Sequence, residues 1–491
     1  MQITKDLYGG VSMALLTDLY QLTMAYGYWK AGRHNDQAVF HLFFRKNPFS
    51  SGYTIACGLE YAIDYLKNLS FTQQDVDYLA GLNGNDGKAL FEKGFLDYLK
   101  ELRFTCDIDA VPEGTVVFPQ QPLVRVTGSL IEAQLIETPL LNMINFQSLI
   151  ATKASRMYLA AEGKNVLEFG LRRAQGIDGS LAASRAAYIG GCDATSNVLA
   201  GRLFDIPVKG THAHSWVMSF DDELEAFNAY AEAMPNNCIF LVDTYDTTEG
   251  VKKAIEAGKI LRKKGYEMLG IRLDSGDLAY LSIKARKLLD DAGFENAQIV
   301  ASNDLDEHII SSLKAQDAKI DVWGIGTKLV TSYDQPALGG VYKLAALKDE
   351  NGNWKYKIKL SEQAIKISNP GILQTRRFFE NGLAVADMIF DQENFDSQSM
   401  IIIDPLDGTR QKKIGDTTSF RDLLVPIFRK GKLIYQMPNI KETKKFVISE
   451  LDTLHRSIKR FTNPHQYPVG LDKKLYDLKT ELILNLRHLK D

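Results

Sequence analysis

The sequence has 491 residues, of which 45% are hydrophobic and 24% charged. This length exceeds that of one simple domain, and the composition is that of a globular protein with large cores. The formal net charge is −3, from 58 basic and 61 acidic side chains, so the basic excess typical of nucleic-acid binding is missing. No apolar run reaches membrane-spanning length, no signal peptide is recognisable, and no cysteine lies in a CxxC pair. We therefore expect a cytoplasmic protein with no membrane or nucleic-acid partner.

Residues 1–140 are predicted to form an α+β domain. The expected elements are a helix over 18–29, a strand over 38–44, a helix over 58–69 and a β-like region over 105–126. Asp18, with Gln21 three residues later, is typical of a capping box at the start of a helix. Tyr20 has two interpretations that stay open, a core position or a ring that stacks on a ligand.

Residues 141–337 alternate short apolar runs with longer helical patterns. Strands are expected at 165–169, 206–209, 239–242, 268–273, 298–302 and 320–325. Helices are expected at 194–204, 221–234, 249–264, 278–292 and 305–315. This alternation predicts an α/β fold with parallel strands and crossover helices, and about six such units favour an irregular (β/α) barrel over an open sheet.

The rest of the chain is expected to add to this barrel. Residues 338–437 are again β-rich and are predicted to pair with the N-terminal segment, so that both complete a second, mixed α+β domain. Residues 438–491 carry an apolar stripe at helical spacing and are predicted to form a helical C-terminal extension.

Polar residues follow each expected barrel strand. Arg172 and Arg173 come just after the strand that ends at Phe169, and two guanidiniums beside an aromatic ring suit a flat anion. In a barrel the carboxyl ends of the strands converge on one face, so scattered residues become neighbours. Asp178, before a helix, is equally typical of a helix cap and of a functional site.

Two later strand ends carry carboxylates. Asp243 is a candidate functional residue, whereas Asp246 and Asp277 fit helix caps. Arg272 lies in an otherwise apolar strand and needs a partner, for which Asp274 is the natural candidate. A carboxylate there can hold ribose hydroxyls or a hydrated Mg²⁺.

The last strand ends in Gly324-Ile325-Gly326-Thr327-Lys328. Glycines let backbone N–H groups approach a phosphate, and late barrel strands often bind phosphate. After an earlier strand come Thr211, His212 and His214. A metal-dependent barrel hydrolase would need more histidines at later strand ends, so a single catalytic histidine, acting as phosphate acceptor or proton shuttle, is the better interpretation.

Taken together, these segments resemble the nicotinate phosphoribosyltransferase family. The resemblance spans residues 14–345, and its motifs are TDLYQLTMAYGY, FHLFFRKNPF, EFGLRRAQGIDG, CDATSNVLAG, GTHAHSWV, VDTYD, IRLDSGDL and GIGTKLVTS. It implies conversion of nicotinate and phosphoribosyl pyrophosphate to nicotinate mononucleotide and pyrophosphate, with ATP as co-substrate and Mg²⁺ as cofactor. It also implies a homodimer with active sites at the interface. The alternatives are a nicotinamide-using phosphoribosyltransferase, a metal-dependent hydrolase and a non-catalytic nucleotide-binding protein.

The resemblance also implies roles for individual residues. For nicotinate they are Tyr20 from a partner subunit, Phe169, Arg172, Ser196, Asn197 and Thr211. For phosphate and pyrophosphate they are Arg45, Lys46, Asn303, Gly324, Gly326 and Thr327. The implied catalytic residues are His214, which would be phosphorylated, Arg272, Asp274 and Asp243, and the last two would lie near Mg²⁺. Nicotinamide-using relatives carry an acidic residue where Ser196 and Asn197 stand, so neutral residues here favour the acid as substrate.

Overall fold

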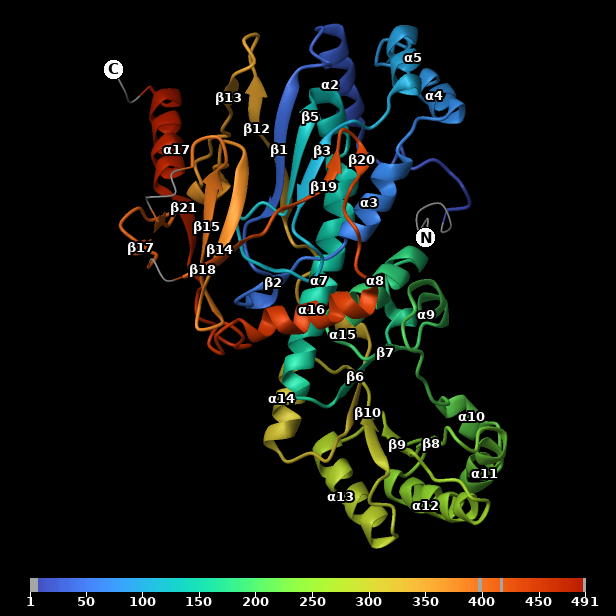
Figure 1. Ribbon diagram of the computed structural model, residues 1–491. Coiled ribbons are helices and arrows are strands. Elements are labelled where there is room, and N and C mark those ends of the chain that lie inside the picture. The colour runs from blue at the N-terminus through green and yellow to red at the C-terminus, as the bar shows by residue number, and fades with distance from the viewer. Residues whose placement is uncertain (1–7, 396–399, 416–417, 489–491) are drawn as a thin grey trace. The chain divides into compact units, whose positions relative to one another are not determined.

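The computed structural model describes residues 8–395, 400–415 and 418–488. The chain divides into two compact units, the first made of residues 1–149 and 337–491 and the second of residues 150–336 (Figure 1). The first unit is therefore discontinuous in sequence. Among the described residues, no helix combines the length and the apolar character that crossing a bilayer requires.

The second unit is built on a parallel six-stranded sheet. Its strand order is β7-β6-β11-β10-β9-β8, and all five neighbouring pairs are parallel. The strands are β6 (Asn165–Glu168), β7 (Ala194–Thr195), β8 (Ile239–Leu241), β9 (Gly270–Leu273), β10 (Gln298–Ala301) and β11 (Val322–Ile325). Their side chains are mostly buried, as expected when crossover helices cover a parallel sheet. Within the described residues β7 and β8 have no common pairing, so closure into a barrel stays a prediction.

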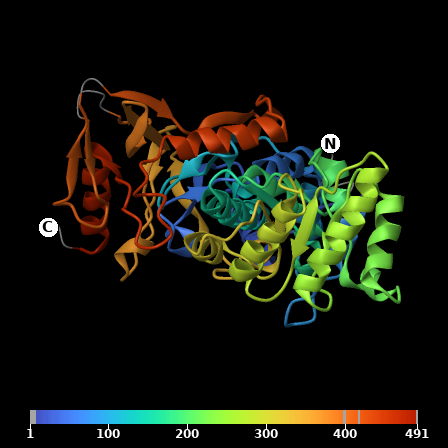
Figure 2. The same ribbon diagram turned by 90° about the horizontal axis from the view of Figure 1, so that it is seen from below.

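Helices alternate with these strands along the chain (green to yellow in Figures 1 and 2). They are α8 (Ile177–Ile189), α9 (Val198–Phe204), α10 (His214–Met218), α11 (Glu223–Ala233), α12 (Thr247–Lys263), α13 (Leu278–Asp291), α14 (Glu307–Ala315), α15 (Thr327–Val330) and the 3₁₀ turn η2 (Leu171–Arg173).

Two predictions for this unit were wrong. The helix expected over 194–204 is divided into β7 and α9, because Asn197 caps the second part by accepting from Ala200 N. The strand expected over 206–209 is reduced to one bridge, between Val208 and Thr195.

The first unit contains two larger sheets and one small sheet. A seven-stranded sheet has the order β13-β12-β1-β5-β3-β19-β20, and β2 pairs with β4. The strands are β1 (Gln37–Phe44), β2 (Thr54–Ile55), β3 (Asp107–Ala110), β4 (Val116–Val117), β5 (Val124–Ser129), β12 (Gly340–Lys348), β13 (Trp354–Tyr356), β19 (Val425–Arg429) and β20 (Lys432–Leu433). Because β1 pairs with both β5 and β12, segments from before and after the second unit share one sheet, as the composition predicted.

A six-stranded sheet completes this unit, in the order β17-β16-β21-β15-β14-β18. Its strands are β14 (Leu373–Glu380), β15 (Leu383–Asp391), β16 (Ile401–Ile403), β17 (Gln411–Lys413), β18 (Ser419–Asp422) and β21 (Val469–Asp472). The predicted all-helical extension from residue 438 is therefore interrupted by β21. A four-residue strand is too short to leave a periodic signal, and it is recognised only by its pairing with β15 and β16.

The helices of the first unit cover these sheets. They are α2 (Leu19–Lys30), α3 (Leu59–Asn68), α4 (Gln73–Ala80), α5 (Lys93–Glu101), α6 (Leu130–Leu135), α16 (Ile440–Asp452) and α17 (Lys473–Leu486), with the 3₁₀ turns η1 (Pro48–Ser50) and η3 (Ala364–Lys366). The long helix α7 (Glu137–Ala161) begins in this unit. Leu475 of α17 packs into a core with Leu373, Ile389 and Leu471 of the six-stranded sheet (red helix and orange strands, Figure 2).

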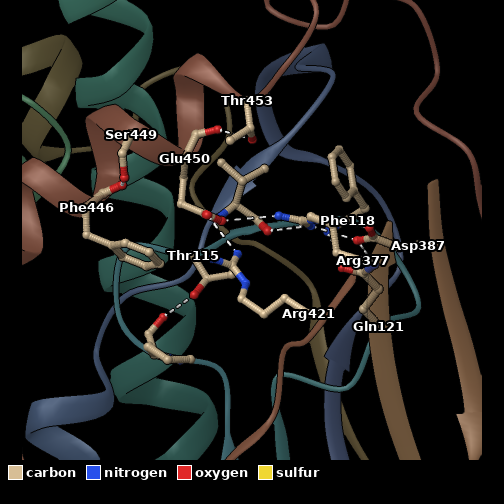
Figure 3. Close-up of polar contacts among 12 residues, drawn as sticks. Thr115, Phe118, Gln121, Arg377, Asp387, Arg421, Phe446, Ser449, Glu450 and Thr453 are labelled. Atoms are coloured by element: carbon tan, nitrogen blue, oxygen red, sulfur yellow. Dashed lines mark hydrogen bonds and ion pairs between the residues drawn. The ribbon is translucent and has the colours of Figure 1, made fainter. Parts of the chain in front are cut away.

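A buried guanidinium connects the two sequence halves of the first unit (Figure 3). Arg377 on β14 is fully buried and donates two hydrogen bonds to Asp387 on β15, at 2.9 and 2.7 Å. It also donates to Glu450 of α16 at 3.2 Å and to the carbonyl of Val116 at 2.8 Å. One side chain thus holds a strand from the N-terminal segment against a sheet and a helix from the C-terminal segment.

We predict that Arg377→Met destabilises the first unit by about 3–5 kcal/mol, because Asp387 is left buried without its cation and Glu450 keeps only its ion pair with Arg421. The free energy of unfolding from urea titration measures this. Arg376→Met is the control, since its partner Asp422 is partly exposed, and it is expected to cost less. Equal losses in the two variants would contradict the prediction.

Candidate functional site

The parallel sheet of the second unit gathers polar residues at the carboxyl ends of its strands. The order β6-β11-β10-β9-β8 places the segments after residues 168, 325, 301, 273 and 241 side by side along one edge. This is the edge at which α/β proteins bind ligands. A cavity of about 720 Å³ lies mostly at the opposite, amino ends of the strands, where Asn165, Ile239 and Gln298 line it, and its lining extends to Phe169 and Thr211.

Phe169 presents a ring at this edge. Its backbone N–H donates to Ile325 O at 2.7 Å, and its ring packs against Gly324. A Cβ added at Gly324 would lie 2.8 Å from Phe169 Cδ2, so only glycine permits this ring position. Arg172 and Arg173 follow on η2, where both are exposed and their side chains have no hydrogen bond or ion pair within the described residues.

Asp243 is the hydrogen-bonding centre of the neighbouring strand ends. Its side chain is 1% exposed, and one carboxylate oxygen lies 3.3 Å from His214 Nε2. The other oxygen accepts from Asp274 N at 2.9 Å and from Ser275 Oγ at 2.6 Å. Asp274 in turn accepts from Ser302 Oγ. Four of these residues follow β8, β9 and β10, so the predicted convergence of strand ends is present.

Arg272 makes a different contact from the predicted ion pair with Asp274. Its Nη1 donates to Thr211 Oγ1, and its Nε is buried without a partner. Burial lowers the pKa of Arg272, and the positive charge of Arg172 acts in the same direction, although Asp274 and Asp243 oppose both effects. The positive charges of Arg172 and Arg272 therefore interact. Sequence adjacency suggested Asp274 as partner, but its carboxylate faces Ser302 instead.

The two adjacent histidines have different environments. His212 is buried, accepts from Leu241 N through Nε2, and has a pKa lowered to about 4, chiefly by burial. His214 begins α10, and its side chain is 38% exposed. Its Nε2 faces Asp243, which leaves Nδ1 without a partner in the described part of the chain. Of the two, only His214 has a ring nitrogen available to a ligand.

The glycine loop after β11 leads into α15, which is only four residues long. This helix is too short to strengthen an anion site by its dipole. Lys328 is not free, because its ammonium pairs with Asp306 at 3.1 Å. Asn303, after β10, has a φ of 117°, a conformation that a non-glycine residue adopts only under strain.

Ser196 and Asn197 lie between β7 and α9. Ser196 is half-buried, whereas Asn197 is 2% exposed. The amide of Asn197 donates to Ser184 Oγ and accepts from Ala200 N, so both ends of that side chain are used inside the protein. Asn197 therefore supports the local backbone, which the sequence did not indicate.

Asp246 and Asp277 cap α12 and α13, as predicted, by accepting from Glu249 N and Tyr280 N. Asp178 lies inside α8 instead of at its N-cap, which is Gly176. Asp18 precedes α2 but makes no cap hydrogen bond, because its carboxylate accepts from Thr138 Oγ1 at 2.7 Å. The predicted capping box was therefore wrong.

Three predicted site residues belong to the first unit. Tyr20 on α2 is 48% exposed. Arg45 and Lys46 follow β1 and line a cavity of about 370 Å³ together with Phe118 and Tyr467. Neither cation has a hydrogen bond or ion pair within the described residues, and burial lowers the pKa of Arg45.

A metal site made by protein ligands alone is not found among the described residues, where no cluster of three or more His, Cys, Asp or Glu side chains has suitable geometry. Mg²⁺ usually needs only one or two carboxylates and completes its shell with water and substrate phosphates. Asp274 fits this use, because only one of its carboxylate oxygens accepts a hydrogen bond within the described residues. Both oxygens of Asp243 are already occupied.

Two residues near the site were missed by sequence reasoning, Glu168 and Ser302. The signal for Glu168 was present, since it is the one charged residue in the apolar run Val166-Leu167-Glu168-Phe169. Ser302 carried no signal, because its role depends on the neighbouring strand.

Comparison with known proteins identifies the family. The model of the nicotinate phosphoribosyltransferase N-terminal domain matches residues 15–145, that of the nicotinate phosphoribosyltransferase family matches residues 165–369, and that of the C-terminal domain matches residues 374–479. The nicotinate phosphoribosyltransferase of Bacillus subtilis (strain 168) is 46% identical over 479 residues, which cover 96% of this chain and 95% of that protein. The human nicotinate phosphoribosyltransferase is 34% identical over 95% of this chain and 96% of its own length.

Solved structures agree with the sequence matches. The crystal structure of human nicotinic acid phosphoribosyltransferase superposes with a TM-score of 0.83 at 32% identity, and the match covers 95% of this chain and 99% of that chain. The chain belongs to the nicotinate phosphoribosyltransferase family of enzymes.

Proposed function

We propose that this enzyme transfers the phosphoribosyl group of phosphoribosyl pyrophosphate to nicotinate, forming nicotinate mononucleotide and pyrophosphate, with ATP as co-substrate. This is the first step of NAD salvage from nicotinate. The observation that carries the proposal is the exposed, unpaired side chains of Arg172 and Arg173 on η2, the turn that follows Phe169. That combination suits a flat aromatic carboxylate.

Nicotinate is proposed to stack on Phe169, with Tyr20 supplied by a partner subunit on its other face. Arg172 would bind the carboxylate. The neutral Ser196 would add no charge that repels an acid, which favours nicotinate over nicotinamide. Thr211, which accepts a hydrogen bond from Arg272, is proposed to contact the substrate as well.

The ring nitrogen of nicotinate already has a lone pair, so the reaction needs no strong base. Displacement of pyrophosphate leaves negative charge on the departing group and positive charge on the ribose. Arg272 and Asp274 are proposed to hold the ribose and the pyrophosphate. When bound, Mg²⁺ would neutralise part of the departing charge, and Asp274 would be its protein ligand. Positioning and electrostatics then supply most of the rate.

Phosphate groups would bind at two places. The backbone at Gly324, Gly326 and Thr327 is proposed to hold the ribose phosphate, with Asn303 beside it. Arg45 and Lys46 are proposed to reach the pyrophosphate from a second subunit of a homodimer. Their lack of partners within the described residues supports this, because a ligand anion would complete them.

His214 is proposed to take the terminal phosphoryl group of ATP. The lone pair of Nδ1 forms an N–P bond while the P–O bond to ADP breaks and ADP keeps its electron pair. The proton stays on Nε2, where Asp243 holds it and stabilises the phosphorylated ring. Hydrolysis of this phosphohistidine would then couple ATP to the cycle.

The test of the proposed function is product formation from phosphoribosyl pyrophosphate and Mg²⁺, with nicotinate or nicotinamide, each with and without ATP. We expect nicotinate mononucleotide, formed faster with ATP. Product formed with nicotinamide and not with nicotinate would show that the enzyme uses the amide as its substrate. Turnover of neither, with ligand still bound, would support a binding protein, and activity dependent on bound zinc would support a hydrolase.

We predict that His214→Ala abolishes stimulation by ATP and leaves ATP-independent synthesis, because only the phosphoryl acceptor is removed. Rates with and without ATP, and retention of ³²P from labelled ATP, measure this. His308→Ala, at an exposed histidine of the same unit, is the control. Loss of both activities to the same extent would contradict the phosphohistidine role.

A second prediction concerns the ring platform. Gly324→Ala places a Cβ 2.8 Å from the Phe169 ring, so the ring must move and the KM for nicotinate is expected to rise about tenfold. Gly179→Ala is the control, since no atom lies within 4 Å of the added Cβ. An unchanged KM in Gly324→Ala would exclude Phe169 as the stacking ring.

A further inference from the structure

Glu168 carries a carboxylate that is buried entirely inside the second unit. Glu168 is the last residue of β6, directly before Phe169, and it is 0% exposed. One carboxylate oxygen accepts from Gly170 N, and the other accepts from Ser184 Oγ at 2.7 Å and from Thr195 Oγ1 at 2.5 Å. Within the described residues it has no cation as partner, so neutral donors alone compensate it. A buried carboxylate of this kind is costly unless every donor is held in place.

The carboxylate fixes the direction of the hydrogen bonds around it. A carboxylate only accepts, so the hydroxyls of Ser184 and Thr195 must point their protons toward it. For Ser184 this is the shorter of its two contacts to acceptors. The lone pairs of the two hydroxyls are then free to accept, from Asn197 Nδ2 at 3.3 Å and from Asn197 N at 2.9 Å. Asn197 is thereby oriented by Glu168 although the two do not touch.

This network has two arms that lead to the proposed nicotinate pocket. The first runs through Gly170 N to η2, which carries Arg172. Gly170 is tightly packed, because an added Cβ would lie 2.4 Å from a methyl group of Val330. The second arm runs through Thr195 and Asn197, the two neighbours of Ser196, and the N–H of Ser196 itself donates to the carbonyl of Glu168 at 2.9 Å.

We propose that Glu168 is a positioning residue that sets the geometry of Arg172 and Ser196 together, and so determines the preference for a carboxylate over an amide on the pyridine ring. This inference rests on the proposed function. Glu168 would not touch the substrate, because its carboxylate is already filled by three donors from the protein.

The negative charge matters here more than the size of the side chain. Glu168→Gln keeps the volume but replaces one acceptor oxygen by an NH₂ group. If the NH₂ faces Gly170, two N–H groups oppose each other. If it faces the hydroxyls, the proton of Ser184 can turn to the carbonyl of Ser180, but the proton of Thr195 must turn toward Asn197 N, which now donates to it. Either orientation leaves a buried donor without an acceptor and disturbs one arm of the network.

The test is the kinetics of Glu168→Gln with each substrate varied separately. We expect the KM for nicotinate to rise at least about fivefold, the KM for phosphoribosyl pyrophosphate to stay within about twofold, and the ratio of nicotinate to nicotinamide turnover to fall. Asp321→Asn is the matched control, a carboxylate that accepts a backbone N–H at the opposite edge of the same sheet. A nicotinate KM unchanged in Glu168→Gln, or equal rises for both substrates, would overturn the inference.

A double-mutant cycle with Arg172→Gln separates this inference from the proposed function. If Glu168 acts through Arg172, the effect of Glu168→Gln on the nicotinate KM is reduced in the Arg172→Gln background, whereas additive effects would overturn the inference. If Arg172→Gln alone leaves the nicotinate KM unchanged, the proposed pocket itself is wrong. If Glu168→Gln does not fold, Ser184→Ala, which removes one donor and keeps the carboxylate, is expected to raise the nicotinate KM selectively, and no such rise would overturn the inference.

Discussion

Buried carboxylates need compensation, because transferring an ionised oxygen out of water is unfavourable unless a cation or several donors replace the water. In the first unit the buried Asp387 forms an ion pair with the buried Arg377. In the second unit the buried Glu307 forms ion pairs with Lys153 and Arg156, which are also buried. These ion pairs hold strands and helices that are distant in sequence. Glu168 and Asp243 accept mostly from neutral donors and backbone N–H groups, and both lie at the carboxyl edge of the parallel sheet. The framework is stabilised by paired charges, and the candidate site by carboxylates that orient neutral groups.

The alternation of apolar runs and helical patterns was enough to predict β8, β10 and α11–α14 to within a few residues, because the helices are long enough to show their own period and each strand coincides with a short apolar run between two helices. It was also enough to predict that the strand ends converge, since parallel strands leave no other arrangement. Helix caps such as Asp246 and Asp277 were predictable because a cap is a local interaction. The failures lie where a contact is not local. The short strand β21 is defined by its pairing with β15 and β16. The carboxylate of Asp18 accepts a hydrogen bond from Thr138 on another helix instead of capping its own helix.

The side-chain partners at the site also could not be predicted from the sequence, because these contacts are not local. Arg272 lies on β9 and Asp274 follows that strand two residues later, which suggested an ion pair, yet Arg272 donates to Thr211 and Asp274 accepts from Ser302, which follows β10. Successive side chains at a strand end can diverge as the strand becomes a loop, so sequence distance does not set spatial distance there. Asn197 was assigned to the ligand from its motif, but its amide is used by Ser184 and Ala200. The motif indicated the right segment, and only the three-dimensional contacts separate the half-buried Ser196 from its supporting neighbour.

Cationic side chains without a carboxylate partner are the second electrostatic feature of the proposed substrate sites. The buried side chains of Arg377 and Lys153 have carboxylate partners, whereas within the described residues the side chains of Arg45, Lys46, Arg172 and Arg173 have none. The proposed substrates bring the missing charge, one carboxylate on nicotinate and several phosphate oxygens on phosphoribosyl pyrophosphate. Burial lowers the pKa of Arg272, Asp274 and Asp243 raise it, and the positive charge of Arg172 lowers it again. An anion bound near both arginines would favour their charged forms. The proposed substrate would thus add negative charge beside cations that have no ion-pair partner within the described residues, and Glu168 would keep Arg172 in position to meet it.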